Sequence, residues 1–205
     1  MMKGVLKRGG RAGGWAAGGR VAGGAANCTS AADGRQEGGW FQGTGTTASG
    51  APQYDLDRAP TRAEAAVMLV RLLGKEADAK ALTYTAPFTD LEGWEAPYVQ
   101  YLYDNKLTTG ATATTFEPKA KCSAQMYTTF LLRSLGYSDT QNGDFTYTGA
   151  LDFAADNVGL IDESFCDTNN FLRDNVAAMS LEALATPVKA TDITLLDKLI
   201  ADGAI

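Results

Sequence analysis

The side chains that most often carry catalysis are absent from this sequence or have no recognisable spacing. The chain has no histidine, which removes the commonest general base, the Ser-His and Cys-His nucleophile pairs, and histidine-based zinc sites. Carboxylates are numerous, so their number alone leaves an acid–base pair open, but no spacing places two of them at a shared site. An enzyme is therefore the least favoured hypothesis, and no cofactor is expected.

Metal-binding patterns are also missing. Cys28, Cys122 and Cys166 are far apart and include no C-x-x-C pair, so neither a disulfide framework nor structural zinc is expected. Cys122 and Cys166 are interpreted as small, buried or half-buried apolar residues. Residues 139–144 superficially suggest a calcium loop, but they lack its register and its glutamate at the twelfth position.

Arg62 is a cation whose position leaves two roles open. It follows Thr61 at the expected start of a helix, where N–H groups and the helix dipole favour an anion. A guanidinium can also bind a carboxylate through two parallel hydrogen bonds. Alternatively, Arg62 is a surface partner of Glu64 or Asp57. Thr61 and Glu64 have the spacing of a capping box and are interpreted first as helix caps.

Charge and glycine content divide the chain into two parts. The sequence has 205 residues, 23 glycines and a net charge of −6, but the first 40 residues are net basic and hold over half of the glycines. Residues 1–39 show no helical or strand periodicity and are predicted to be disordered. They contain no apolar core of an export signal, and no run in the chain is long enough to span a membrane. The acidic remainder argues against a nucleic-acid partner.

The second part has apolar residues at helical spacing and predicts an all-α fold. Residues 123–136 repeat the pattern of residues 61–74, and residues 173–181 repeat it more weakly, with Arg173 opposite Thr61. Each of these helices follows another helix, and such hairpins must pack together to bury their apolar faces. The predicted helices cover residues 61–73, 95–106, 123–135, 149–158, 174–185 and 191–202.

An ordered set of motifs resembles the S-layer homology (SLH) domain family. The resemblance is strongest between Tyr54 and Asp139. It consists of Phe-Thr-Asp at 88–90, Trp94, Lys-Leu-Thr-Thr-Gly at 106–110, Phe-Glu-Pro at 116–118 and Thr-Arg-Ala-Glu at 61–64.

The resemblance implies three helix-loop-helix repeats in a pseudo-three-fold bundle. The expected units are a Gly/Arg-rich segment (1–39), a partial first repeat (40–82), a second repeat (83–140) and a degenerate third repeat (141–205). It also implies a non-catalytic module at the bacterial cell surface, with an effector domain absent from this chain. Such a module binds an anionic secondary cell-wall polysaccharide, often bearing a ketal-linked pyruvate. The alternative is a degenerate repeat array that packs against another protein.

By this resemblance the ligand-binding residues are Arg62, Asp90, Trp94, Gly110 and Thr61. They would line a groove between the helix of Arg62 and the second repeat. Residues 123–126 and 173–176 depart from Thr-Arg-Ala-Glu, so at most one groove is expected to keep the family arginine in register.

Three of these positions also have structural interpretations. Trp94 is favoured as a core anchor over a sugar-stacking residue. Asp90 is expected to cap the turn into the following helix, and Gly110 to adopt a left-handed turn.

Of the three tyrosines between residues 98 and 103, two are expected to pack and Tyr101 to face solvent. Arg133 is expected to have little effect on binding.

Overall fold

The computed structural model of the chain describes residues 44–161 and 168–205. The predicted disordered segment at 1–39, Cys28 and Cys166 lie outside these residues. The described part is mostly helical, as the apolar periodicity predicts. Its helices are α2 (Arg62–Leu72), α3 (Glu76–Lys80), α4 (Ala96–Asp104), α5 (Ala124–Ser134), α6 (Ala150–Phe153, continued by a π-helical turn at Ala154–Val158), α7 (Arg173–Ala185) and α8 (Leu195–Ala201).

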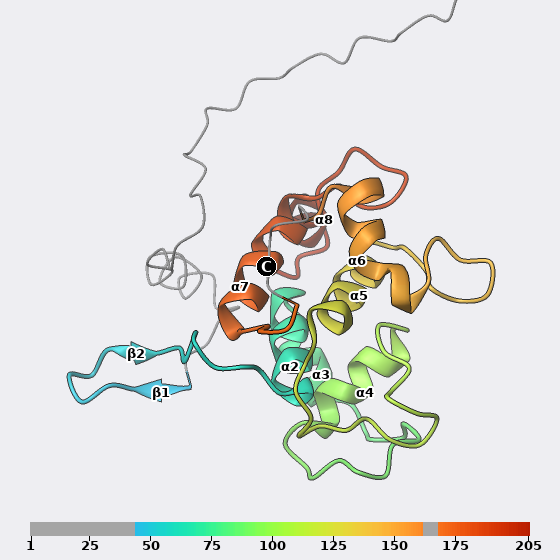
Figure 1. Cartoon of the computed structure of the whole chain (residues 1–205). Helices are drawn as coiled ribbons and strands as arrows, with labels where there is room; N and C mark the ends of the chain where they lie inside the picture. Colours follow the sequence, from blue (N-terminus) through green and yellow to red (C-terminus); the bar gives the residue numbers. More distant parts are fainter. Residues whose placement is uncertain (1–43, 162–167) are drawn as a thin grey trace, which may run out of the picture.

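All six predicted helices are confirmed, and a short helix, a two-stranded hairpin and a 3-10 turn at Tyr147–Gly149 accompany them. The helix α3 has five residues, too few to show a helical period. A two-stranded antiparallel hairpin joins β1 (Gly45–Thr46) to β2 (Pro52–Gln53). Its residues are exposed on both faces, so it carries no alternating apolar pattern, and it projects away from the helices (Figure 1).

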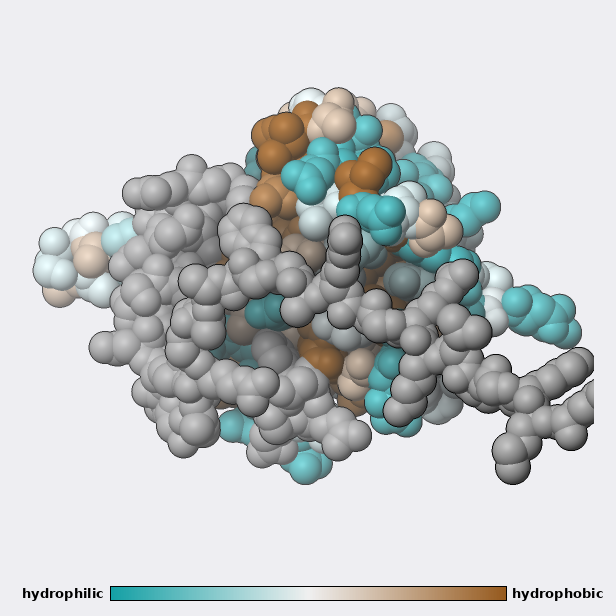
Figure 2. Space-filling view, turned by 90° about the horizontal axis from the view of Figure 1, so that it is seen from above, coloured by the Kyte–Doolittle hydropathy of each residue, from teal (hydrophilic) through white to brown (hydrophobic). Residues whose placement is uncertain are grey.

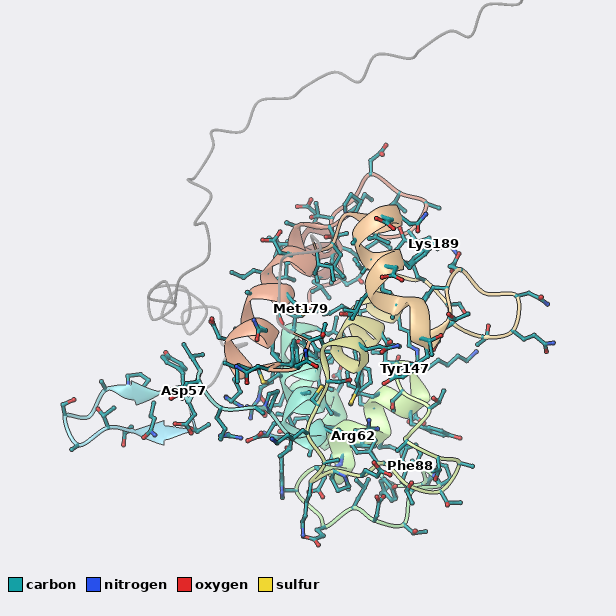
Figure 3. All side chains as sticks on the ribbon, in the orientation of Figure 1. Asp57, Arg62, Phe88, Tyr147, Met179 and Lys189 are labelled. Carbon is teal, nitrogen blue, oxygen red and sulfur yellow. The ribbon has the colours of Figure 1, made fainter. Side chains whose placement is uncertain are left out.

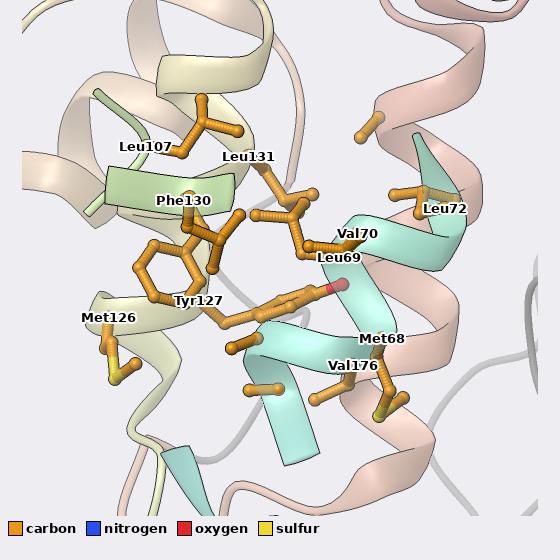
Figure 4. Packing of buried hydrophobic residues seen from close by; sticks show 14 of the residues in the cluster. Met68, Leu69, Val70, Leu72, Leu107, Met126, Tyr127, Phe130, Leu131 and Val176 are labelled. Carbon is orange, nitrogen blue, oxygen red and sulfur yellow. The ribbon is translucent and has the colours of Figure 1, made fainter. Parts of the chain in front are cut away.

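The helix α2 lies at the centre of the helical body and contacts α3, α4, α5 and α7 (Figure 1). This position explains why α2 is apolar on almost every face, since neighbours surround it. The ring of Tyr127 is fully buried between α2 and α7, and its hydroxyl lies 2.7 Å from Ser180 Oγ. Figure 4 shows this ring among Leu69, Val70 and Val176. One apolar core therefore joins helices from all three parts of the sequence.

The capping box at the start of α2 is confirmed. Glu64 N donates to Thr61 Oγ1 over 3.2 Å, and the Glu64 carboxylate accepts from Thr61 N over 2.7 Å. Ser123 caps α5 in the same way, because Met126 N donates to Ser123 Oγ over 3.1 Å. Glu64 and Met126 thus hold the same third position of their helices.

The tyrosines of α4 differ from the prediction. Tyr98 is 5% exposed and Tyr103 is 39% exposed, whereas Tyr101 is half-buried. The expectation that Tyr101 faces solvent is wrong because α3, which the periodicity did not reveal, packs against α4. Burial beside α3 raises the pKa of Tyr101, and the charge of Asp78 raises it further.

Among the described residues, none of the helices has both the length and the apolar character that crossing a bilayer requires. Ile193, Ile200 and Ile205 remain exposed at the C-terminal end of the chain. Apolar residues also lie among hydrophilic ones on the face seen in Figure 2.

Candidate functional site

The start of α2 packs against the loop that precedes α5. Arg62 N donates to Ala120 O over 2.9 Å, and Ala63 N donates to Pro118 O over 3.1 Å. These contacts satisfy the first amide groups of the helix, whose next donor is capped by Thr61. The expectation that these N–H groups attract an anion is therefore wrong, and only the Arg62 side chain remains to do so.

The Arg62 side chain lies along this same loop. Its Nε donates to Phe116 O over 2.7 Å, its Nη1 contacts Met126 Sδ at 2.9 Å, and its guanidinium lies 5.1 Å from the centre of the Phe116 ring. No described carboxylate lies within ion-pair distance of Arg62. The alternative of a surface pair with Glu64 is wrong, because Glu64 binds Arg58 through two bonds of 2.7 and 2.9 Å.

Arg62 lines a cavity of about 400 Å³ between the start of α2 and several other parts of the chain, which include the acidic residues Glu117 and Asp139. Gly110 and Ala111 come from the loop after α4, and Arg133 comes from α5. Tyr147, which begins the segment leading into α6, also lines the cavity and is 47% exposed. Figure 3 labels Arg62 and Tyr147 on their separate elements. A guanidinium beside an exposed aromatic ring can hold an anionic, ring-shaped ligand.

Gly110 is required by the shape of the loop that lines this cavity. Its φ is +84°, which confirms the predicted left-handed turn. A Cβ atom built there would lie 2.4 Å from Phe88 Cε1 and 2.6 Å from Thr112 O. The backbone can therefore pass close to the buried Phe88 ring only at a glycine.

Asp90 holds the neighbouring loop instead of capping the turn into α4. Its carboxylate accepts from Phe116 N over 2.9 Å and from Glu117 N over 2.7 Å. Burial raises the pKa of Asp90, but these bonds and the charge of Arg62 outweigh that effect and leave the pKa below its ordinary value. Asp90 thereby fixes the segment whose carbonyl positions Arg62, although Asp90 does not itself line the cavity.

Trp94 does not occupy the core. It lies in a bend before α4 and is 60% exposed, so the favoured interpretation as a core anchor is wrong. Phe88 and Phe116 fill the interior of this repeat instead, at 3% and 0% exposure. Neither Trp94 nor Thr61 lines the Arg62 cavity.

Sequence reasoning gave no binding role to Arg133, Thr129 or Tyr147, which all line the cavity. One feature of the sequence could have drawn attention to Arg133. It aligns with Arg71 when residues 123–136 are laid on residues 61–74. Each forms a paired contact with a carboxylate shortly after its helix, with Asp139 and with Glu76 respectively. Nothing in the local sequence around Tyr147 indicates its place beside Arg62.

Arg173 is the first residue of α7, as Arg62 is the first residue of α2. Arg173 N donates to Arg58 O over 2.9 Å, and Arg173 Nε donates to Tyr54 O over 3.0 Å. Leu172 N donates to Asn175 Oδ1 over 2.8 Å, as Thr61 N does to Glu64. Leu172 therefore corresponds to Thr61, and the expected register of the third repeat is wrong by one residue.

The two arginines differ in their surroundings. Arg173 is 4% exposed, and its Nη1 lies 3.9 Å from Glu64 Oε1. At the Arg62 junction the equivalent position holds Met126, whose sulfur carries no charge. The expectation that at most one junction keeps the arginine in register is wrong, because both do. They differ in whether a carboxylate already faces the guanidinium.

Cys122 and the acidic side chains are the remaining groups that could react or bind a metal ion. Cys122 is 3% exposed, as predicted, and burial raises its pKa to about 12. Within the described ranges, no group of three Cys, Asp or Glu side chains is arranged to hold a metal ion.

Comparison with known proteins gives a family and several proteins to which parts of this chain are similar. Residues 87–123 match the family described as S-layer homology domain. The chain is 30% identical over 108 residues to an endoglucanase of Bacillus sp. (strain KSM-635), a match covering 47% of this chain and 12% of that protein. It is 29% identical over 93 residues to the middle cell wall protein of Brevibacillus brevis, covering 44% and 9%. It is 28% identical over 92 residues to a surface layer protein of Brevibacillus choshinensis, covering 44% and 8%.

The part of the chain that is similar to the S-layer homology domain is thus residues 87–123. This segment contains Asp90, Trp94 and Gly110, whereas Arg62 precedes it. The matches span about a tenth of the length of these relatives.

Proposed function

We propose that this chain is a non-catalytic module that attaches to the bacterial cell wall by binding an anionic secondary cell-wall polysaccharide in the Arg62 cavity. The observation that carries the proposal is the guanidinium of Arg62, which lines a cavity with no ion-pair partner among the described residues. A carboxylate on a sugar, such as that of a ketal-linked pyruvate, would supply the missing charge. Tyr147 would offer its exposed ring to the sugar.

The match to an endoglucanase does not extend the proposal to catalysis. The aligned part covers 12% of that protein, and matches of similar length and identity link this chain to a cell wall protein and a surface layer protein. Similarity to short parts of proteins with such different names is what an attachment module would produce. The cell surface is the location that this proposal implies.

The proposal includes three repeats in a pseudo-three-fold arrangement, with the units at 40–82, 83–140 and 141–205 as expected. Its support is the equivalence of two junctions. The α2 start bonds the loop at 116–120, and the α7 start bonds the loop at 54–58 through the same kinds of backbone and side-chain contact. Repeat three thus meets repeat one as repeat one meets repeat two.

Within this arrangement, the Arg62 junction is the ligand site and the Arg173 junction is structural. Glu64 lies beside Arg173 and partly neutralises it inside the protein. Met126 leaves the charge of Arg62 available. A single site gives no gain from multivalency within one chain.

The test is co-sedimentation of the full chain with cell-wall sacculi, with and without their secondary polymers. Arg62→Ala should weaken binding about ten- to a hundred-fold, because a hydrogen bond to a charged group contributes about 1.5–3 kcal/mol. Arg62→Lys should recover part of the loss, since an ammonium cannot make the paired contact. Lys119→Ala is the control, because Lys119 is exposed and lies outside the cavity.

Unchanged binding by Arg62→Ala would overturn the proposal and favour the alternative packing module. The exposed side chains of Ile193 and Ile200 are the observation behind that alternative. Such apolar surface suits contact with another protein better than contact with a charged polymer.

A further inference from the structure

A second cavity, of about 610 Å³, adjoins the Arg62 cavity. The two cavities share Thr108, Thr109, Arg133 and Asp139 in their linings. The second cavity lies between the C-terminal end of α4 and the turn that follows α5. The two cavities therefore lie side by side, with these four residues between them.

The shared wall carries no free charge. Arg133 Nε and Nη2 donate to the two oxygens of Asp139 over 2.9 and 2.7 Å, and Arg133 Nη1 donates to Leu107 O over 2.8 Å. The two side chains are 10% and 12% exposed. The pair is therefore held in place and neutral overall. It lies between the Arg62 cavity and the second cavity, and it repels neither an anionic nor an uncharged sugar.

The second cavity has the side chains that hold uncharged sugar rings. Tyr103 is 39% exposed and packs edge-on against Phe88, with ring centres 5.5 Å apart. Tyr137 packs in the same manner against Phe153, at 5.3 Å. Each ring is fixed by a neighbour and lines the cavity. Aromatic faces that need no reordering bind apolar sugar faces at low entropic cost.

Polar groups around these rings are balanced in charge. Asp104 and Lys106 both line the cavity, and so do Ser138 and Thr140, whose hydroxyl oxygens lie 2.8 Å from each other. One acid and one base give no net preference for an anion. Hydroxyl groups can donate to and accept from sugar hydroxyls equally well.

We propose that this second cavity is a further saccharide subsite, which takes an uncharged sugar unit of the polymer whose anionic unit lies at Arg62. The inference rests on the proposed function and deepens it. The substrate class is then a chain of at least two sugars in which an anionic unit neighbours a neutral one. A single anionic sugar fills only the first cavity.

The experiment uses fragments released from the secondary wall polymer and separated by size into single units and longer oligosaccharides. Binding of each fraction to the full chain is measured by calorimetry. Tyr103→Ala should weaken binding of the longer fraction about two- to ten-fold, the range expected for one aromatic contact. It should leave binding of single anionic units unchanged. Tyr103→Phe should bind like the parent, because the ring remains.

Trp94→Ala is the matched control, since Trp94 is an exposed aromatic residue outside both cavities. Equal affinity of Tyr103→Ala and the parent for the longer fraction would overturn the subsite. The proposed function would still stand if Arg62→Ala weakened both fractions. If Arg62→Ala weakened neither fraction, the proposed function itself would fail.

Discussion

Arg62 and Arg173 each donate their Nε hydrogen to the backbone carbonyl of an aromatic residue in a neighbouring loop, Phe116 and Tyr54 respectively. This shared contact fixes where each guanidinium lies. What differs is the residue at the third position of the adjoining helix, which is Met126 in one junction and Glu64 in the other. One side chain thus distinguishes an arginine open to a ligand from one that is already paired.

Met126→Glu should reduce binding to sacculi at least about ten-fold. The new carboxylate would lie beside Arg62 and compete with the ligand for its guanidinium, as a charged hydrogen bond of about 1.5–3 kcal/mol implies. Met126→Leu keeps the volume without the charge and should bind nearly as the parent does. Sedimentation of both variants measures the effect, and equal binding by the glutamate variant would show that Arg62 does not carry the ligand charge.

Arg173→Ala should destabilise the protein by about 2–3 kcal/mol, because it removes a buried hydrogen-bond donor from the Tyr54 carbonyl and a charge from the side of Glu64. The same change at the half-buried Arg62 should cost about 1 kcal/mol or less. Urea denaturation of the two variants provides the comparison. Equal losses of unfolding free energy would contradict a structural role specific to Arg173.

Gly110→Ala should destabilise the protein by about 1–3 kcal/mol, the cost of a strained left-handed residue. The added methyl group must also displace the Phe88 ring or the Thr112 carbonyl. Gly93→Ala is a matched control, because Gly93 also has a positive φ but a Cβ there meets nothing within 4 Å. Thermal denaturation should therefore show a larger loss at Gly110, and the reverse order would mean that the loop adapts.

Glu76 should make the stability of the α2–α3–α4 contact depend on pH. Its carboxylate accepts from Arg71, from Tyr98 over 2.7 Å and from Lys80 over 2.9 Å. The Arg71 hydrogen bond, followed by those of Tyr98 and Lys80, outweighs burial and lowers its pKa from 4.5 to about 2. The folded state thus binds this proton less readily than the unfolded state does.

The contribution of Glu76 is therefore complete above about pH 5 and falls as the pH drops from 4.5 towards 2. Glu76→Gln should cost about 1–3 kcal/mol at pH 7 and much less at pH 3. Glu182→Gln, an exposed position on α7, should change stability little at either pH. Urea denaturation at the two pH values tests this, and a pH-independent loss at Glu76 would contradict it.

Local features of the fold were predictable from sequence. The capping box of Thr61 and Glu64 and the six helices depend on residues within about four positions of one another, so their pattern is visible along the chain. The left-handed turn at Gly110 is equally local. The short helix α3 and the hairpin were missed because they are too short or too exposed to carry a period.

The register of Arg173 was not predictable in this way, because Leu172 occupies the cap position without a capping side chain. The Leu172 side chain then gives no marker for the start of the helix, which the bond from Leu172 N to Asn175 Oδ1 and the bonds to the loop at 54–58 fix together. The exposure of Trp94 likewise depends on Phe88 and Phe116 already filling the interior of the repeat.

The sequence by itself determined six of the helices, the capping box of Thr61 and Glu64, the family motifs and the presence of an arginine suited to an anion. The tertiary structure alone decided which carboxylates reach which arginines, and which loops line the cavities. The physical reason is that helix formation is governed by neighbours a turn away, whereas charge pairing and burial depend on side chains brought together from distant parts of the chain. Arg62 meets Met126 and Arg173 meets Glu64 only once the helices have packed.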